Sequence, residues 1–145
     1  MKKCDRPALD AQQKRWDDAY AGDPEFFGAE PSYPARKAAA LMKAEGAQRL
    51  LELGAGQGRD TIFFAREGFR VCAVDYSKSA IEGIRRNARR LGLHAVSTVR
   101  HDLRQPLPFE DGSFDACYCH MLFCMAFCTS ELEALFDEVR RVLKP

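Results

Sequence analysis

The chain is predicted to be an α/β protein with a doubly wound parallel sheet. Short apolar runs alternate with segments of helical pattern, a glycine-rich turn follows the first run at once, and acidic residues stand at the ends of the runs. Alternation of this kind makes a parallel sheet with helices on both faces, and its ligands bind beyond the carboxyl ends of the strands. A Rossmann-like sheet of four strands in the order 3-2-1-4 is therefore expected.

Two helices are expected before the sheet. Residues 10–20 have a helical pattern, and an alanine-rich helix over 35–46 follows a loop that is punctuated by glycine and proline. We expect a single domain over residues 1–145. In this domain residues 1–46 form an N-terminal helical lid and the first helix, and residues 47–145 form the core.

The core begins with a short apolar strand at residues 49–53. The elements expected after it are a helix over 58–68, a strand over 70–75, a helix over 77–93, strands over 95–102 and 115–121, and a helix over 131–144. Ser79 with Glu82, and Ser130 with Glu133, have the spacing of capping boxes for the last two helices. The apolar positions of the last helix follow helical spacing and are expected in the core: Leu132, Leu135, Phe136, Val139, Val142 and Leu143.

Composition and charge favour a small-molecule partner. The chain has 145 residues, 46% of them hydrophobic and 30% charged, and a formal net charge of +1. It therefore offers no electrostatic attraction for nucleic acid or for an anionic membrane. The N-terminus lacks the apolar stretch of a signal peptide, and no run approaches the roughly 18 apolar residues of a membrane span. A cytoplasmic protein with reduced cysteines is expected.

The glycine-rich turn follows the first strand as Gly54-x-Gly56-x-Gly58. A dinucleotide-binding loop has the spacing G-x-G-x-x-G, and a phosphate-binding Walker loop needs a lysine that is absent here. A tight strand-to-helix turn without a ligand remains an alternative for this pattern.

Three acids at the ends of the strands change the expected ligand. Glu52, beside the glycine loop, would repel a phosphate and suit an ammonium group or another positive centre. Asp75 ends the second strand about 20 residues further on, where a carboxylate accepts both hydroxyls of a ribose. Asp102 ends the third strand, where it would accept from an exocyclic amine such as that of adenine, or else only turn the loop. S-adenosylmethionine carries all three groups.

Two stretches resemble motifs of the class I S-adenosylmethionine-dependent methyltransferases. LLELGAGQGRDTIFFAREGFRVCAVDYSKSAIE matches the glycine element and the acid after the second strand, and LPFEDGSFDA matches the loop that enters the fourth strand. GQGRDTIFFAREG and WDDAYAGDPEFFGAEPS most resemble the small-molecule and tellurite-resistance-type branch. The resemblance covers essentially the whole chain, and it implies a Rossmann-like fold, S-adenosyl-L-methionine as cofactor and methyl transfer to a small molecule.

The resemblance also implies a set of cofactor-binding residues. They are Glu52, Gly54, Gly56, Gly58, Asp75, Tyr76, Asp102, Leu103 and Cys119. In this set Asp75 would bind the ribose, and Tyr76 would flank the adenine or merely pack. Asp102 would accept from the adenine amine near the main-chain amide of Leu103, and the main chain of Cys119 would meet the methionine amino group.

By the same resemblance, the N-terminal segment closes over the cofactor and faces the substrate with Tyr20, Phe27 and Ser32, unless these residues only pack as a lid. His120, just past the fourth strand, is the candidate catalytic base, and a loop histidine without a role is the alternative. In-line displacement at the sulfonium methyl depends mainly on proximity and orientation of the acceptor.

Four cysteines and one histidine lie between Cys117 and Cys128. Structural zinc sites use paired Cys-x(2–4)-Cys modules that converge on one ion. Because the intervening residues are apolar or aromatic and a second Cys-x-x-Cys-like pair is absent, small buried thiols are expected here and a metal is not.

The resembled family continues past the last helix with a glycine-rich turn, a fifth strand and a closing hairpin, and we expect a chain truncated before them. The fourth strand would then be an exposed edge that pairs with another chain, so a homodimer through this edge is expected. Methyl transfer to a small-molecule acceptor is the leading prediction. The alternative is a truncated module that binds S-adenosylmethionine without turnover. A nicotinamide-dependent oxidoreductase is a weaker third hypothesis, disfavoured by the glycine spacing and by Glu52.

Overall fold

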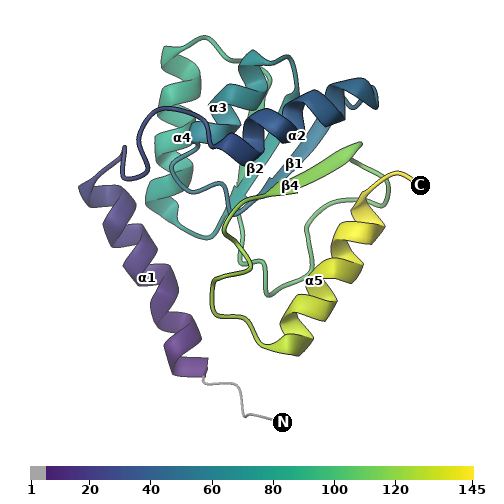
Figure 1. The fold of residues 1–145 in the computed structure, drawn as a ribbon. Helices are drawn as coiled ribbons and strands as arrows, with labels where there is room; N and C mark the ends of the chain where they lie inside the picture. The colour runs from purple at the N-terminus through teal and green to yellow at the C-terminus, as the bar shows by residue number, and fades with distance from the viewer. Residues whose placement is uncertain (1–5) are drawn as a thin grey trace.

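The computed structural model describes residues 6–145, and its elements follow the predicted order. The helices are α1 (Arg6–Gly22), α2 (Tyr33–Ala44), α3 (Arg59–Arg66), α4 (Lys78–Arg90) and α5 (Thr129–Val142). The strands are β1 (Arg49–Leu53), β2 (Arg70–Asp75), β3 (Val96–Arg100) and β4 (Ala116–Cys119). Figure 1 shows the sheet between α5 on one face and α2 and α3 on the other, and α1 lies against the start of α4.

The four strands form one parallel sheet in the order β3-β2-β1-β4. This confirms the predicted Rossmann-like topology. β1 is central, because Leu51 lies opposite Cys72 of β2 on one side and opposite Cys117 of β4 on the other. The carboxyl ends of all four strands lie along one edge of the sheet. The ends of β3 and β4 are the two extremes of this edge.

Successive residues of β1 face opposite sides of the sheet and build two cores. Leu50 packs with Phe64 of α3 and with Ala39 of α2. Leu51 packs on the other face with Leu135 of α5. β1 is buried on both faces. Its final residues, Glu52 and Leu53, are therefore packed in place at the edge where the functional site lies.

The helix α4 begins two residues earlier than the capping pattern predicted. Ser77 is its N-cap, because the Ser77 hydroxyl accepts a hydrogen bond from the main-chain N–H of Ala80 at 3.1 Å. The main-chain N–H of Ser79 instead donates to the carboxylate of Asp17 in α1 at 2.8 Å. The lid helix therefore completes the cap of α4, which local sequence alone does not reveal.

The cap of α5 is also shifted from the predicted pair Ser130 and Glu133. The carboxylate of Glu131 accepts from the main-chain N–H of Cys128 at 2.9 Å, at the start of the helix. The helical periodicity correctly placed Leu135 in the core.

Phe136 was wrongly expected in the core, since it is 55% exposed. Phe136 lies roughly 100° around the helix from Leu135, and it is Leu135 that faces the sheet. Its ring packs instead against Phe123, with 5.2 Å between the ring centroids.

The cysteines only partly follow the expectation of reduced thiols. Cys72, Cys117, Cys119 and Cys124 are free, and Cys128 is disulfide-bonded. In residues 6–145 we found no cluster of histidine, cysteine and carboxylate side chains that would hold a metal ion. None of the helices in this range is both long and apolar enough to cross a membrane.

Candidate functional site

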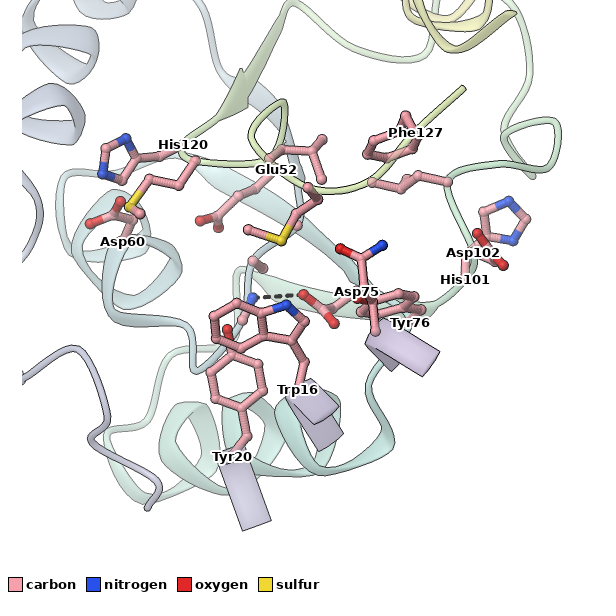
Figure 2. Close-up of a pocket in the computed structure, with 18 of the residues that line it drawn as sticks. Trp16, Tyr20, Glu52, Asp60, Asp75, Tyr76, His101, Asp102, His120 and Phe127 are labelled. Atoms are coloured by element: carbon pink, nitrogen blue, oxygen red, sulfur yellow. Dashed lines mark hydrogen bonds between the residues drawn. The ribbon is translucent and has the colours of Figure 1, made fainter. Parts of the chain in front are cut away.

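A pocket runs along the carboxyl edge of the sheet, from the segment after β3 to the segment after β4. Its floor is formed by the ends of β1 and β2 with Glu52 and Asp75, and its roof by Trp16 and Tyr20 of α1. Figure 2 shows these side chains facing one another, with His120 beyond Glu52. The pocket therefore gathers side chains from both ends of the sequence.

The glycine loop lets the main chain and the lid approach closely. Gly56 has a φ of +56°, and a Cβ built there would lie 2.6 Å from the hydroxyl oxygen of Tyr20. Gly54 (φ +70°) lines the pocket as well, and its Cβ would lie 3.0 Å from Leu122. Gly58 is absent from the lining, because it packs against Ile84 of α4, where a Cβ would come within 2.5 Å. Two of the three glycines thus shape the pocket, and the third allows helix packing.

Asp75 is the best-fixed acid of the pocket and is 6% exposed. One carboxylate oxygen accepts from the main-chain N–H of Gly56 at 2.9 Å, and the other accepts from Ser77 at 2.8 Å. Burial raises the pKa of Asp75, and the two main-chain donors oppose that rise. Each carboxylate oxygen has two lone pairs, so both oxygens retain capacity for further donors such as a pair of vicinal hydroxyls.

Glu52 sits at the centre of the floor and is 3% exposed. Its carboxyl accepts a hydrogen bond from the hydroxyl of Thr61 in α3 at 2.6 Å. Burial, with the nearby carboxylates of Asp60 and Asp75, raises the pKa of Glu52 to about 8 despite the Thr61 bond. This carboxyl therefore ionises less readily than an ordinary glutamate, and a cation entering the pocket would favour its ionisation.

Asp60 is a pocket acid that the sequence analysis did not single out. Its carboxylate accepts from the main-chain N–H and the hydroxyl of Ser32, both at 2.7 Å, and from the hydroxyl of Tyr118 at 3.2 Å. Ser32 also caps α2 by accepting from Ala35. Ser32 is buried and does not line the pocket, so the structure favours the alternative that it packs in the lid over the predicted contact with substrate.

Asp102 lies at the β3 end of the pocket together with Tyr76 and Leu103. The main chain and guanidinium of Arg104 make four hydrogen bonds to the Asp102 carboxylate, between 2.6 and 3.1 Å. Burial acts to raise the pKa of Asp102, but the bonds from Arg104 outweigh it and hold that pKa below its usual range. Three donor groups of Arg104, one of them shared between both oxygens, thus take up most of the ordinary acceptor capacity of this carboxylate. The geometry therefore favours the loop-turning role of Asp102 over acceptance from an adenine amine.

Aromatic rings of the N-terminal segment cover the pocket. Trp16 stacks on Tyr20 with 5.6 Å between ring centroids, and the Trp16 ring lies 6.0 Å from that of Phe27. All three line the pocket, and a contact of Tyr20 and Phe27 with substrate stays a prediction. Trp16 falls in the helix expected over residues 10–20, and no local pattern tells a core-facing ring from a pocket-facing one.

Polar side chains fasten this lid at both ends. Asp17 accepts from the Ser77 hydroxyl at 2.7 Å, and its hydrogen bonds at the start of α4 hold its pKa below the usual range. Gln57 of the glycine loop accepts from the main-chain N–H of Phe27 at 2.6 Å and donates to the carbonyl of Gly28 at 2.7 Å. Arg59 donates to the Phe27 carbonyl at 2.8 Å. The loop that shapes the floor thus also positions the roof.

The segment after β4 forms the far wall of the pocket. His120, Met121 and Leu122 line it, whereas Cys119 is absent from the lining because it packs against the core beneath α5. Met121 has a φ of +58° and lies in the left-handed region, which is uncommon for a residue with a side chain. Such backbone strain clusters at functional sites.

Comparison with known proteins was made for sequence and for structure. Residues 50–145 match the family described as "Methyltransferase domain". A demethylmenaquinone methyltransferase of Tropheryma whipplei is 31% identical over 110 residues, which are 76% of this chain and 43% of that protein. A 23S rRNA (uracil(1939)-C(5))-methyltransferase of Chromohalobacter salexigens is 34% identical over 73 residues, which are 50% of this chain and 15% of that protein.

A solved structure of the PH0226 protein from Pyrococcus horikoshii is 33% identical and superposes with a TM-score of 0.61. The match covers 78% of this chain and 50% of that one. The chain thus spans less than half the length of the curated relatives that it matches.

Proposed function

The chain belongs to the methyltransferase domain family, and on this premise we propose that it binds S-adenosyl-L-methionine and transfers its methyl group to a small-molecule acceptor. The observation that carries the proposal is the position of the Asp75 carboxylate. Two main-chain amides hold it at the pocket floor, and both its oxygens retain acceptor capacity. A pair of ribose hydroxyls suits such a carboxylate.

The remaining residues of the pocket fit this cofactor. Tyr76 and Leu103 offer apolar surface beside Asp75 for an adenine ring. Glu52, buried at the end of the central strand, suits the positively charged part of the molecule, because a nearby cation favours the ionised carboxylate. When bound, S-adenosylmethionine supplies a methyl group activated by its sulfonium centre.

The chain's own residues would act by orientation and by exclusion of water. Trp16, Tyr20 and Phe27 would cover the reacting groups, and the lid contacts would hold them in place. His120, at the end of β4, would accept a proton from an acceptor that loses one. Proximity and orientation account for most of the rate in such a displacement.

A small acceptor is favoured over RNA by charge, although one of the relatives is named for rRNA. The net charge of +1 offers little attraction for a polyanion. The name of the Tropheryma whipplei relative is consistent with a small acceptor. We also propose that β4, whose one partner strand in the described sheet is β1, supports self-association through its outer edge beyond the bridge between Phe114 and Leu143.

Trp16 allows a direct test of cofactor binding, because it is the single tryptophan and lies in the roof. Titration with S-adenosylhomocysteine should change Trp16 emission saturably, whereas NAD⁺ should not. A methyl-transfer assay with labelled S-adenosylmethionine then separates an enzyme from a module that binds without turnover. Binding of NAD⁺ in preference to S-adenosylhomocysteine would contradict the proposal.

A further inference from the structure

A second groove lies between α4 and the edge strand β3, and none of the described residues lines both this groove and the pocket. The chain turns back at Gly92, which has a φ of +64°, and the main-chain N–H of Leu93 donates to the carbonyl of Ala88 at 2.9 Å. β3 then runs beside α4 as far as Thr98, whose hydroxyl accepts from Nε of Arg85 at 2.7 Å. Contacts between helix and strand therefore bound the groove at both ends.

Guanidinium, imidazole and hydroxyl groups line this groove, and no carboxylate of residues 6–145 does. The polar lining consists of Arg85, Arg89, His94, Ser97 and Thr98, and Ala88, Leu93 and Val96 add apolar surface. Arg85 uses only two of its five donors on Thr98. Such a lining attracts an anion and offers it charge-assisted hydrogen bonds.

The basic residues of this region are segregated from the acids of the chain. The segment 83–101 contains five of the 22 lysine and arginine residues and none of the 21 aspartate and glutamate residues. The net charge of +1 for the whole chain therefore conceals one strongly basic segment, which forms the second half of α4 and all of β3.

The arginines of α4 repel one another without a compensating acid. Arg85 and Arg89 are one turn apart on the same face of the helix, and like charges at this spacing are destabilising. Arg86 and Arg90 repeat this spacing on the neighbouring row. In the part of the chain that the structure describes, none of these four side chains makes an ion pair. Cations suit the end of a helix, but Arg85 lies a full turn before the last one.

We propose that the groove between α4 and β3 is a second binding site, which takes the phosphate group of a small ligand with Arg85, Arg89 and His94 as donors. A phosphate group carries up to two negative charges and three strong acceptor oxygens, which match two guanidinium groups and an imidazole. The apolar surface of Leu93 and Val96 gives room for the body of the ligand. This site is independent of the proposed function, because the pocket for the cofactor is lined by other residues.

Histidine ring signals provide the measurement. The chain has three histidines, of which His94 lines the groove, whereas His101 and His120 line the pocket. The protein is labelled with ¹³C-histidine and titrated with inorganic phosphate at constant pH, with the ionic strength held by sodium chloride. Acetate, phenyl phosphate and an oligouridylate are titrated separately, and His94→Asn assigns the signal.

We expect inorganic phosphate to shift the His94 signal saturably, with a dissociation constant of about 1 mM or below, and to leave the His101 and His120 signals in place. Acetate, with one charge and two oxygens, should bind at least about tenfold more weakly. Phenyl phosphate should bind about threefold more tightly than inorganic phosphate, because its ring buries apolar surface of the groove.

Substitutions of Arg89 separate charge from geometry. Arg89→Gln should weaken phosphate binding at least about tenfold, and Arg89→Lys, which keeps the charge but loses the forked donors, should fall between. Arg140→Gln, at an exposed arginine of α5 outside the groove, should bind phosphate like the wild type. All three variants should keep S-adenosylhomocysteine affinity within about twofold, and thermal unfolding verifies that they are folded.

Phosphate that leaves the His94 signal in place, or that shifts all three histidines alike without saturation, would overturn the inference. Equal phosphate binding by the wild type and Arg89→Gln would overturn it as well. An oligouridylate that binds more than about a hundredfold more tightly than phosphate, with an affinity that falls steeply with salt, would assign the groove to a nucleic acid instead of a small ligand. These outcomes leave the proposed function standing, and failure of S-adenosylhomocysteine to bind would leave this inference standing.

Discussion

The carboxylate of Asp75 accepts a hydrogen bond from the main-chain N–H of Gly56 at 2.9 Å, which joins the end of β2 to the glycine loop that follows β1. The same acid accepts from Ser77, the N-cap of α4. One side chain therefore links the loop, the strand end and the helix start around the pocket floor. Loss of this carboxylate is expected to disturb ligand binding directly and through the loop.

The buried Glu52 predicts a pH-dependent stability. Its pKa is raised to about 8, above that of an unfolded glutamate. A carboxyl with a raised folded pKa contributes stability that is complete below the unfolded pKa and is lost as pH rises through the folded one. Glu52→Gln should remove this dependence, which amounts to a few kcal/mol on the order-of-magnitude scale of such shifts.

Urea unfolding of the ligand-free protein at pH 5 and pH 8 measures this effect. The wild type should lose more unfolding free energy between the two pH values than Glu52→Gln does. Equal losses in the two proteins would show that Glu52 titrates normally.

The Ser32–Asp60 contact predicts a loss of stability without a loss of binding. Ser32→Ala removes the 2.7 Å bond to Asp60 and the cap of α2, so it should lower the unfolding free energy by about 1–3 kcal/mol. Because Ser32 lies outside the pocket lining, affinity for S-adenosylhomocysteine should stay within about twofold. Weaker binding at unchanged stability would instead restore Ser32 as a ligand contact.

The lid is predicted to loosen when its link to α4 is cut. Asp17→Ala removes bonds to the Ser77 hydroxyl and the Ser79 amide. Trp16 should then become more accessible to acrylamide quenching, and S-adenosylhomocysteine affinity should fall by about threefold to tenfold. The neighbouring Asp18→Ala breaks only an exposed pair with Lys14 and serves as the control. Identical quenching in the two variants would argue that Asp17 does not hold the lid.

The outer edge of β4, beyond the bridge between Phe114 and Leu143, is proposed to support self-association. Light scattering with size-exclusion chromatography should give a mass above that of one chain, rising with concentration. A monomer of constant mass over the whole concentration range would count against pairing through this edge.

The fold was largely predictable, because buried strands and glycine-punctuated helices leave local signals. The run before Gly54 and the acid at the end of the second strand predicted the central strands and the place of Asp75 correctly. Tertiary partners were not visible in the same way. Asp60 gains its role from Ser32 and Tyr118, which lie 28 and 58 residues away, and no spacing rule relates these positions.

Competition between neighbouring polar groups caused the other differences. Asp102 was expected either at an adenine amine or as a turn of the loop, and the bonds from Arg104, two residues further on, favour the second interpretation. Ser79 had the spacing of a cap, but Asp17 of the lid takes its amide and the cap moves to Ser77. In both cases the sequence pointed to a polar residue that does form hydrogen bonds. The partner in those bonds could not be told from the spacing of the residues.

The affinity of Asp75→Ala for S-adenosylhomocysteine tests the central claim most directly. Calorimetry should show a loss of at least about tenfold, because the ribose loses its acceptor. The exposed Asp137→Ala should bind like the wild type, and thermal unfolding verifies that both variants are folded. A folded Asp75→Ala protein that binds S-adenosylhomocysteine as tightly as the wild type would contradict the assignment of this pocket to the cofactor.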